Sequence, residues 1–314
     1  MTTFSTNTTI ANDVSANFQA WVNEIYNALV TNCGLTQTAD TGQMAVPCTT
    51  ALTGANTASG YYVFRFNDTL QATSPVFIKL ECGQGSVTTG VGSPLILITV
   101  GSSTNGAGTI TGLISARSAC TASNTGITGG GTTNCISRYC YNATQGYLGV
   151  QFKLISSPNS WGGFHIYRSV DNTGAPTATA VNIINNVYNV TNGSGSNLQT
   201  LSYIDYVTSA VGQTGLPSPS AIVGSAFGIT SAIVGTTTNI FPCLQWAPTL
   251  TTPGAGYTNT GGLIFNTDVG IGSTFTATVI GTTSLTYINI GVPCGCNQIF
   301  SLSTATYGFA MLWQ

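Results

Sequence analysis

The first clear element in the chain is an amphipathic helix near the N-terminus. Apolar residues recur there in steps of three and four positions, the spacing of one helix face. They are Phe18, Trp21, Val22, Ile25, Tyr26, Leu29 and Val30. Asn12 and Asp13 are suited to cap the start of a helix, and Gly34 is suited to end it. We therefore predict a helix between these positions, with its apolar face buried.

Beyond residue 60 the pattern changes to short segments that alternate every two residues or form compact apolar runs. Turn-forming Gly, Asn, Ser and Pro residues separate them, as between strands. The clearest alternations are Leu148/Val150/Phe152/Leu154 with Tyr147/Gln151/Lys153, Phe275/Ala277/Val279 with Thr274/Thr276/Thr278, and Tyr307/Phe309/Met311/Trp313. We expect each of these strands to have one apolar face and one face in wetter surroundings.

These patterns predict a mainly β protein. An N-terminal helix with a small sheet would precede one or more antiparallel, β-sandwich-like regions. Residues 121–134 are rich in Gly, Thr, Ser and Asn and include three consecutive glycines, which is typical of a long loop or linker. We accordingly predict a helix-plus-β docking domain in residues 1–115, a loop or linker in 116–140, and a β-rich domain in 141–314.

Charge is scarce in this chain. Its 314 residues include 6 Lys and Arg, 8 Asp and Glu and one His, for a net charge of −2, whereas about a quarter of an ordinary domain is charged. A hydrophobic content of 42% argues against disorder. The longest apolar stretches, such as 95–100, are much shorter than the roughly 18 residues that span a bilayer. We therefore expect a folded protein without membrane insertion.

The cations stand singly along the sequence, at Arg65, Lys79, Arg117, Arg138, Lys153 and Arg168. Binding to a nucleic-acid backbone requires clustered cations, so we expect no nucleic-acid partner. The first fifteen residues, MTTFSTNTTIANDVS, contain neither a basic segment nor a continuous apolar one, and we expect no signal peptide. Synthesis in a cytoplasm follows from that expectation.

Nine cysteines occur at irregular spacing, at positions 33, 48, 82, 120, 135, 140, 243, 294 and 296. A cytoplasm keeps thiols reduced, so buried free thiols are the preferred interpretation. The pairs Cys135/Cys140 and Cys294/Cys296 resemble metal half-sites, but zinc needs four ligands at recognisable spacing. We expect no metal and no other cofactor.

Specific strings in the first third of the chain resemble a known group of proteins. They are QTADTGQM (37–44), GYYVFRFNDTLQATSPVFIKLECG (60–83) and ITVGSSTNGAGTITG (98–112), with weaker echoes in FHIYRSVDNTGAPT (164–177) and the final MLWQ. These strings resemble virion-associated structural proteins of tailed bacteriophages, of the tail or fibre type. The resemblance implies a component of the virus particle and supplies no catalytic residues.

Enzymatic chemistry has little support in the sequence. The eight acids lie more than ten residues from one another, and a glycosidase needs two carboxylates in one cleft. Asp68 and Asp171 lie in turn-like strings, where Asp commonly makes local hydrogen bonds. His165 would have to serve any Ser-His-Asp triad, but no G-x-S-x-G motif and no P-loop occur. We therefore predict that the protein is not an enzyme.

Aromatic residues offer a second kind of site. Exposed aromatics beside amides bind sugars, and aromatics are also enriched in protein interfaces. The candidate contacts for a glycan or a neighbouring subunit are Tyr61, Tyr62, Tyr139, Tyr141, Trp161, His165 and Tyr167. Alternation places His165 opposite Phe164 and Ile166, which favours a surface or interface position. The alternative is that these aromatics fill the cores of the β layers.

The leading hypothesis is a structural virion protein of the tail, baseplate or attached fibres, assembled as a homo-oligomer with other virion proteins. Interface cores are depleted of charge, so a surface poor in ions suits subunit contact. Such contacts should depend weakly on salt. A capsid decoration protein is the first alternative, and a receptor-binding protein that binds or depolymerises host glycan is the second.

Overall fold

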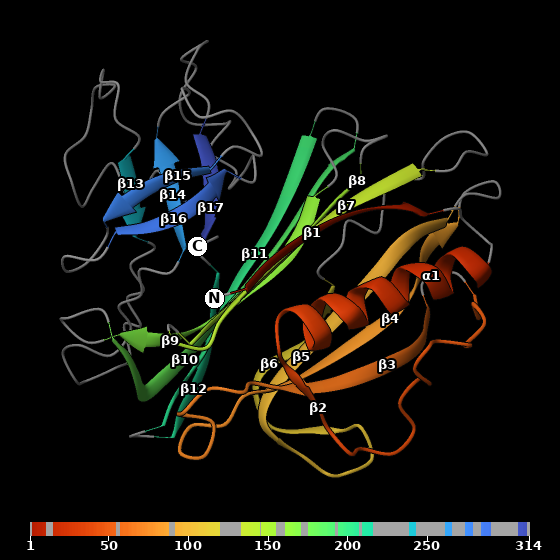
Figure 1. Ribbon diagram of the computed structural model, residues 1–314, viewed down its shortest axis with the longest axis horizontal. Coiled ribbons are helices and arrows are strands. Elements are labelled where there is room, and N and C mark those ends of the chain that lie inside the picture. Colours follow the sequence, from red (N-terminus) through yellow and green to blue (C-terminus); the bar gives the residue numbers. More distant parts are fainter. Residues whose placement is uncertain are drawn as a thin grey trace.

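The protein is described here from a computed structural model (Figure 1). It describes residues 2–10, 15–54, 57–87, 92–119, 133–144, 146–154, 161–170, 175–191, 194–206, 209–215, 239–242, 261–265, 274–278, 284–289 and 307–312. In these segments a single α-helix accompanies three antiparallel sheets. The chain is therefore mainly β, as predicted, and none of its described helices is long and apolar enough to cross a membrane.

The predicted helix is α1 (Ser15–Tyr26), continued by a π-helical segment, η1 (Asn27–Asn32). Five of the seven apolar positions that defined its pattern are buried, including Phe18, Trp21 and Ile25, and the other two, Tyr26 and Val30, are partly buried. Gly34 follows with a φ of +80°, a left-handed conformation that favours glycine and ends the helical segment. The prediction of the helix and of its end is confirmed.

Sheet B follows the helix directly and has five strands in chain order. They are β2 (Thr36–Gln37), β3 (Thr57–Arg65), β4 (Phe77–Val87), β5 (Gly92–Thr104) and β6 (Ile110–Ala119). Each strand pairs with the next, so sheet B is a meander that needs only local connections.

Sheet A has seven strands. They are β1 (Thr2–Ile10), β7 (Thr133–Asn142), β8 (Tyr147–Leu154), β9 (Trp161–Val170), β10 (Pro176–Thr191), β11 (Ser194–Asp205) and β12 (Ala210–Gly215). The last six form a second meander, and β1 from the start of the chain pairs with β7. The N-terminal strand thus joins the sheet built from the middle of the chain.

Sheet C contains the strands nearest the C-terminus, in the order β13-β14-β17-β16-β15. Its strands are β13 (Asn239–Pro242), β14 (Gly261–Phe265), β15 (Thr274–Thr278), β16 (Ser284–Asn289) and β17 (Tyr307–Leu312). Two of the predicted alternating segments are confirmed as β15 and β17. Val279 and Trp313, which belonged to those patterns, lie outside the described residues.

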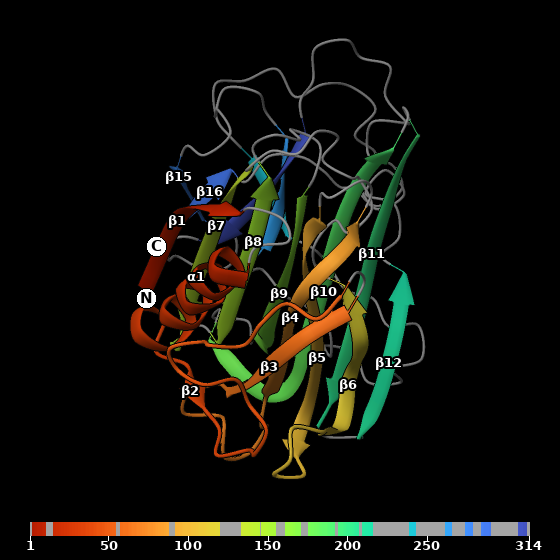
Figure 2. The same cartoon turned by 90° about the vertical axis from the view of Figure 1, so that its right-hand side faces the viewer.

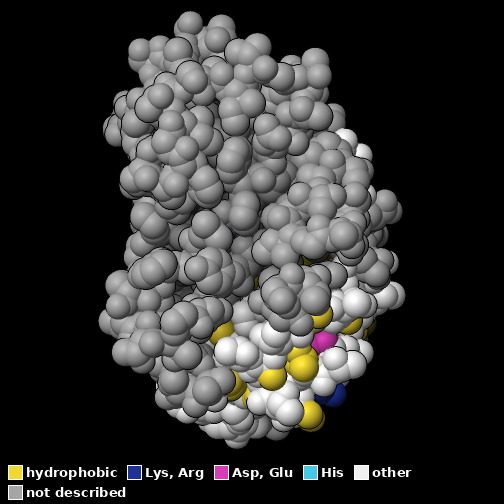
Figure 3. Space-filling view, turned by 90° about the vertical axis from the view of Figure 1, so that its left-hand side faces the viewer, with side chains coloured by type: hydrophobic (Ala, Val, Ile, Leu, Met, Phe, Trp, Pro, Cys, Tyr) yellow, Lys and Arg dark blue, Asp and Glu magenta, His cyan; other side chains and the backbone are white. Residues whose placement is uncertain are grey.

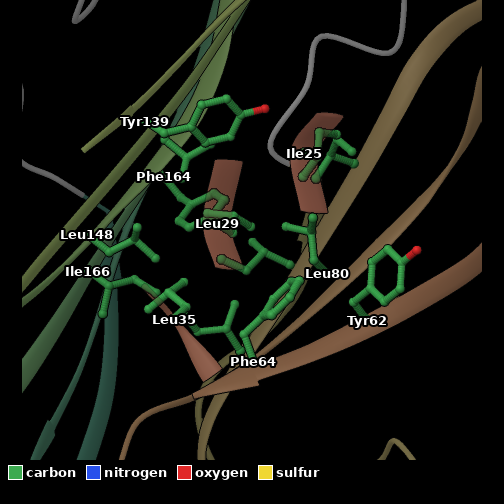
Figure 4. Packing of buried hydrophobic residues seen from close by; sticks show 14 of the residues in the cluster. Ile25, Leu29, Leu35, Tyr62, Phe64, Leu80, Tyr139, Leu148, Phe164 and Ile166 are labelled. Atoms are coloured by element: carbon green, nitrogen blue, oxygen red, sulfur yellow. The ribbon is translucent and has the colours of Figure 1, made fainter. Parts of the chain in front are cut away.

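Helix α1 lies between sheets A and B and contributes side chains to both (Figure 4). Trp21 packs edge-on against Phe152 of β8, with ring centroids 6.1 Å apart. On the other side, Tyr26 packs against Tyr62 of β3 at 5.0 Å. The amphipathic face predicted from the sequence is therefore the centre of a core that both sheets share.

Beyond the helix the two sheets approach each other directly. Strand β6 of sheet B contacts β10, β11 and β12 of sheet A, and Figure 2 shows β6 and β12 side by side. Sheets A and B thus form a sandwich that is narrow at this edge and is held open by α1 at the other. This arrangement agrees with the predicted sandwich-like architecture.

The predicted boundary at residues 116–140 runs through one hydrophobic core rather than between two. The buried cluster joins residues from both sides of the boundary, such as Phe64 and Ile78 with Phe152 and Phe164. Helix α1 makes this possible, because it presents apolar side chains to both sheets. Of the predicted linker, residues 116–119 and 133–140 instead belong to strands β6 and β7, and residues 120–132 lie outside the described residues.

Strand β8 differs from its prediction on one face. Leu148, Val150 and Phe152 are buried, as expected from their alternation. The face predicted to be wetter is also buried, with Tyr147 0% and Gln151 5% exposed. Alternation along the strand indicated which side chains share a face, but not whether that face is covered.

Candidate functional site

The structure places most of the candidate contact residues inside the chain. Five of the seven are at most 4% exposed: Tyr62, Tyr139, Tyr141, His165 and Tyr167. Tyr62 and Tyr139 point into the core around α1 (Figure 4). Trp161 pairs through its backbone with Lys153 and Tyr188, and its side chain lies outside the described residues. The prediction that these five residues contact a glycan or a neighbouring subunit is therefore wrong for the single chain. Their side chains lie inside the β layers, which was the alternative interpretation.

His165 is the clearest correction, because the alternation favoured a surface or interface position and the side chain is 3% exposed. Phe164 and Ile166 fill the core beside α1, and His165 occupies the opposite face of β9, which is buried as well. Its Nδ1 shares a hydrogen bond of 2.7 Å with the hydroxyl of Tyr147, and the two rings stack. Burial lowers the pKa of His165 to about 3, so the ring is neutral at pH 7.

Tyr61, the remaining candidate, is partly exposed and holds two loops against sheet B. The single proton of its hydroxyl is shared between the carbonyl oxygen of Thr41, at 2.8 Å, and that of Ala107, at 3.4 Å. A Cβ at Gly108 would lie 2.1 Å from the same hydroxyl, so only glycine fits there. Lys79 places its Nζ 4.2 Å from the centroid of the Tyr61 ring. Tyr61 therefore positions its neighbours.

The carboxylate of Asp40 joins the same two loops. It accepts hydrogen bonds from the Thr38 hydroxyl at 2.6 Å, the Gly108 N–H at 2.9 Å and the Thr104 hydroxyl at 3.0 Å. Burial alone would raise the pKa of Asp40, but these hydrogen bonds outweigh burial and lower it. Asp40 is thus an ionised structural group.

The outer face of sheet B is turned away from α1 and carries most of the partly exposed charge in the described residues. We define this face by Tyr61, Arg65, Phe77, Lys79, Glu81 and Arg117. Strand alternation separates these residues from the buried residues Tyr62, Phe64, Ile78 and Leu80. Figure 2 views the molecule from the side of sheet B. Half of the six cations of the chain lie on this one face.

Strand pairing sets the spacing of these cations. Arg65 lies opposite Phe77, and Lys79 is two residues farther along β4. Diagonal neighbours of this kind are about 7–8 Å apart. Arg117 lies in a β-bulge of β6, two strands from Lys79 and about 10 Å away across the sheet. These cations are scattered along the sequence, and the strand register brings them onto one surface.

One carboxylate offsets this positive face. Arg117 donates to Glu81 through Nε at 2.7 Å and through Nη2 at 3.3 Å, while its side chain stays 55% exposed. Across the described segments, no carboxylate lies within ion-pair distance of Arg65 or Lys79. The outer face of sheet B therefore has an excess of positive charge.

A buried ion pair joins the two sheets. Arg168 of β9 donates through Nε to Asp68 at 2.6 Å and through Nη2 at 2.9 Å, and both side chains are almost inaccessible, at 0% and 1%. Its Nη1 donates to the carbonyl and hydroxyl oxygens of Ser74. Gly146, with a φ of +58°, leaves room for this arginine, since a Cβ there would lie 2.8 Å from Arg168 Cγ. These contacts fix β9 to the connection between β3 and β4.

Glu24 differs from Asp40 in the direction of its pKa shift. It lies on α1, and burial raises its pKa from 4.5 to about 7. Its Oε1 has no hydrogen-bond partner among the residues that the structure describes, and the same holds for Nε1 of Trp21, one helical turn earlier. The shift reflects the cost of burying charge without compensation.

Five cysteines fall within the described segments, and all are buried free thiols: Cys33, Cys48, Cys82, Cys135 and Cys140. This confirms the expectation of buried thiols for these five. Burial raises the pKa of Cys33 to about 12, which makes its thiolate scarce at neutral pH. No group of three or more His, Cys, Asp or Glu residues in the described part could hold a metal ion. The half-site candidate Cys294/Cys296 lies outside those residues.

No known protein family, curated protein or solved structure matches the chain. The function proposed below therefore rests on the residues of the chain itself and on the resemblance noted in its sequence.

Proposed function

We propose that the chain is a structural protein of a tailed-bacteriophage virion, assembled as a homo-oligomer in the tail, the baseplate or the attached fibres. In this proposal the protein acts by binding copies of itself and other virion proteins, without catalysis or a cofactor.

The three main strings that carry the resemblance lie within sheet B and its loops, while the weaker echo that begins at Phe164 lies in sheet A. Residues 60–83 form β3 and β4, while 37–44 and 98–112 supply the two loops that Asp40 and Tyr61 connect. The similarity to virion proteins thus falls mainly on sheet B and its fixed loops, and leaves out residues 92–97 of β5 and 113–119 of β6. A similarity of this kind favours a shared structural role over isolated matching residues.

The observation that carries the proposal is that several of the few ionisable side chains bind groups inside the fold and do not face solvent. Asp40, Asp68, His165 and Arg168 are all engaged in internal hydrogen bonds or ion pairs. The described surface is correspondingly poor in charge, and Figure 3 shows mostly uncharged polar and hydrophobic atoms where the described residues are visible. Because interface cores exclude charge and tolerate such atoms, this composition suits a subunit.

Light scattering coupled to size-exclusion chromatography tests the assembly of the purified chain. We expect an oligomer of defined mass that persists between about 0.1 M and about 1 M salt, since screening acts mainly on exposed charges. A monomer at all concentrations and both salt levels would contradict the proposal.

Electron microscopy of intact particles tests the location. Tail, baseplate and fibre positions require density for this chain on the threefold or sixfold axis of the tail. Density distributed over the capsid lattice would instead assign the protein to decoration of the capsid, and absence from purified particles would refute the virion role.

A further inference from the structure

We propose that the outer face of sheet B binds an acidic polysaccharide. The carboxylates of the glycan would contact the three cations of this face, and a sugar ring would pack against Phe77. This proposal does not depend on whether the chain assembles, because the face is formed within a single copy.

Two of the three cations are held in place before any ligand arrives. Lys79 lies over the ring of Tyr61, whose hydroxyl is fixed by two carbonyl oxygens. Arg117 is oriented by its two hydrogen bonds to Glu81 and remains 55% exposed. Side chains that are already ordered lose less conformational entropy on binding. The face therefore presents two of its three cations at fixed positions, and Glu81 offsets the charge of one of them, Arg117.

An aromatic ring stands among these charges. Phe77 is partly exposed and lies opposite Arg65 in the register of β3 and β4. It shares the face of Lys79 and Glu81, on the side of the strand opposite the buried Ile78. Pyranose rings have an apolar face that packs on aromatic rings, and an arginine beside the ring can bind a sugar carboxylate through two hydrogen bonds. This pairing favours a charged sugar over a simple anion.

The centre of the face argues against a protein partner. Interface cores are depleted of charged residues, and of lysine in particular. Here Lys79 is central, and the apolar neighbours Val63 and Leu97 are already buried, at 0% and 9%. Leu113, at 48%, is exposed at the margin.

The spacing of the cations also indicates the shape of the ligand. Their backbone positions lie about 7–8 Å apart for Arg65 and Lys79, about 10 Å for Lys79 and Arg117, and about 16 Å for Arg65 and Arg117, instead of converging on one point. A single phosphate could reach only one of them directly. A linear chain with regularly spaced carboxylates can reach all three, which favours a polyuronate.

Binding of the full-length chain to polygalacturonate, measured by biolayer interferometry at about 0.05 M salt, tests the proposal. We expect R65Q combined with K79Q to weaken binding by about tenfold. K153Q is the matched control, because it removes one cation from β8 of sheet A and should leave binding unchanged. Thermal melting of each variant establishes that it folds.

A second comparison separates sugar recognition from charge attraction. F77L should weaken binding to polygalacturonate about threefold and leave any binding to polyglutamate unchanged. The proposal is overturned if polygalacturonate does not bind, if neutral dextran binds equally, or if R65Q with K79Q binds like the unmodified chain. Equal binding of polygalacturonate, polyglutamate and single-stranded DNA at matched charge also overturns it, because charge alone would then explain the interaction. None of these outcomes bears on the oligomeric state, which the assembly experiment measures separately.

Discussion

Replacing Asp68 by Asn should destabilise the chain by about 3 kcal/mol, because the change leaves the Arg168 guanidinium buried without its counter-charge. In the structure the two side chains are 0% and 1% exposed and share two hydrogen bonds, of 2.6 and 2.9 Å. Removing one partner of such a pair costs about 3–5 kcal/mol. The lower end applies here, since asparagine retains one acceptor oxygen and Ser74 still binds Nη1.

The chain offers a matched control in its other described ion pair. Glu81→Gln makes the same acid-to-amide change opposite Arg117, at an N–O distance of 2.7 Å. Arg117 is 55% exposed, so water can replace much of the lost interaction, and we expect a cost below about 1 kcal/mol. The two variants differ chiefly in burial, which is therefore the variable tested.

Urea unfolding followed by circular dichroism measures both costs in the same buffer. Equal losses of unfolding free energy in D68N and E81Q would refute the reasoning that burial sets the cost. A double variant, D68L with R168M, supplies a further check. Because it removes both charges together, it should recover most of the stability lost in D68N.

Three further predictions concern buried or anchored groups. Burial raises the pKa of Glu24 from 4.5 to about 7, so the folded state holds a proton that the unfolded chain has lost, and stability should fall as pH rises through this window. Glu24→Gln should remove that fall in stability. At about pH 8 the variant should be more stable than the parent by about 1 kcal/mol, a value reduced because part of the side chain is exposed. An unchanged urea midpoint at that pH would contradict this prediction. Burial lowers the pKa of His165 from 6.5 to about 3, so the unfolded state takes up the proton first and stability should decline as pH falls from 6.5 towards 3. His165→Gln should abolish that decline in urea midpoints, and a variant as acid-sensitive as the parent would disprove the cause. Tyr61→Phe should cost about 1 kcal/mol and accelerate amide exchange around Thr41 and Gly108, whereas unchanged exchange would show that the hydroxyl does not hold these loops.

The sequence correctly predicted the elements in which the spacing of apolar residues reflects the burial of one face. The spacing of Phe18, Trp21, Val22 and Ile25 reflects a single buried helix face, and α1 has that face. The alternation in residues 147–154 likewise predicted β8. The shared core could not be predicted in the same way, because nothing local indicates that α1 packs against both sheets. The predicted boundary at 116–140 followed composition, and composition is silent about such long-range packing.

The candidate aromatics show the same limit at single residues. Alternation correctly separated His165 and Tyr167 from Phe164 and Ile166. The prediction that the face of His165 and Tyr167 would be exposed was wrong, because both faces of β9 are buried. A sheet covered on one side produces the alternation of polar and apolar residues that the interpretation assumed. In sheet A, polar side chains such as His165 are instead accommodated inside by hydrogen bonds.

The cations were missed for a different reason, and it changes the meaning of the low charge. Arg65, Lys79 and Arg117 lie 14 and 38 residues apart in sequence, and only the pairing of β3 to β6 and the bulge at Arg117 bring them together. The chain has a net charge of −2, yet the outer face of sheet B carries three cations and one carboxylate, so the other residues carry three cations and seven acids. In an ordinary domain, about a quarter charged, neighbouring ions of both signs would largely cancel such a cluster. Here few neighbours compete with it, so a small positive face can select an anionic ligand while the rest of the surface remains suited to subunit contact.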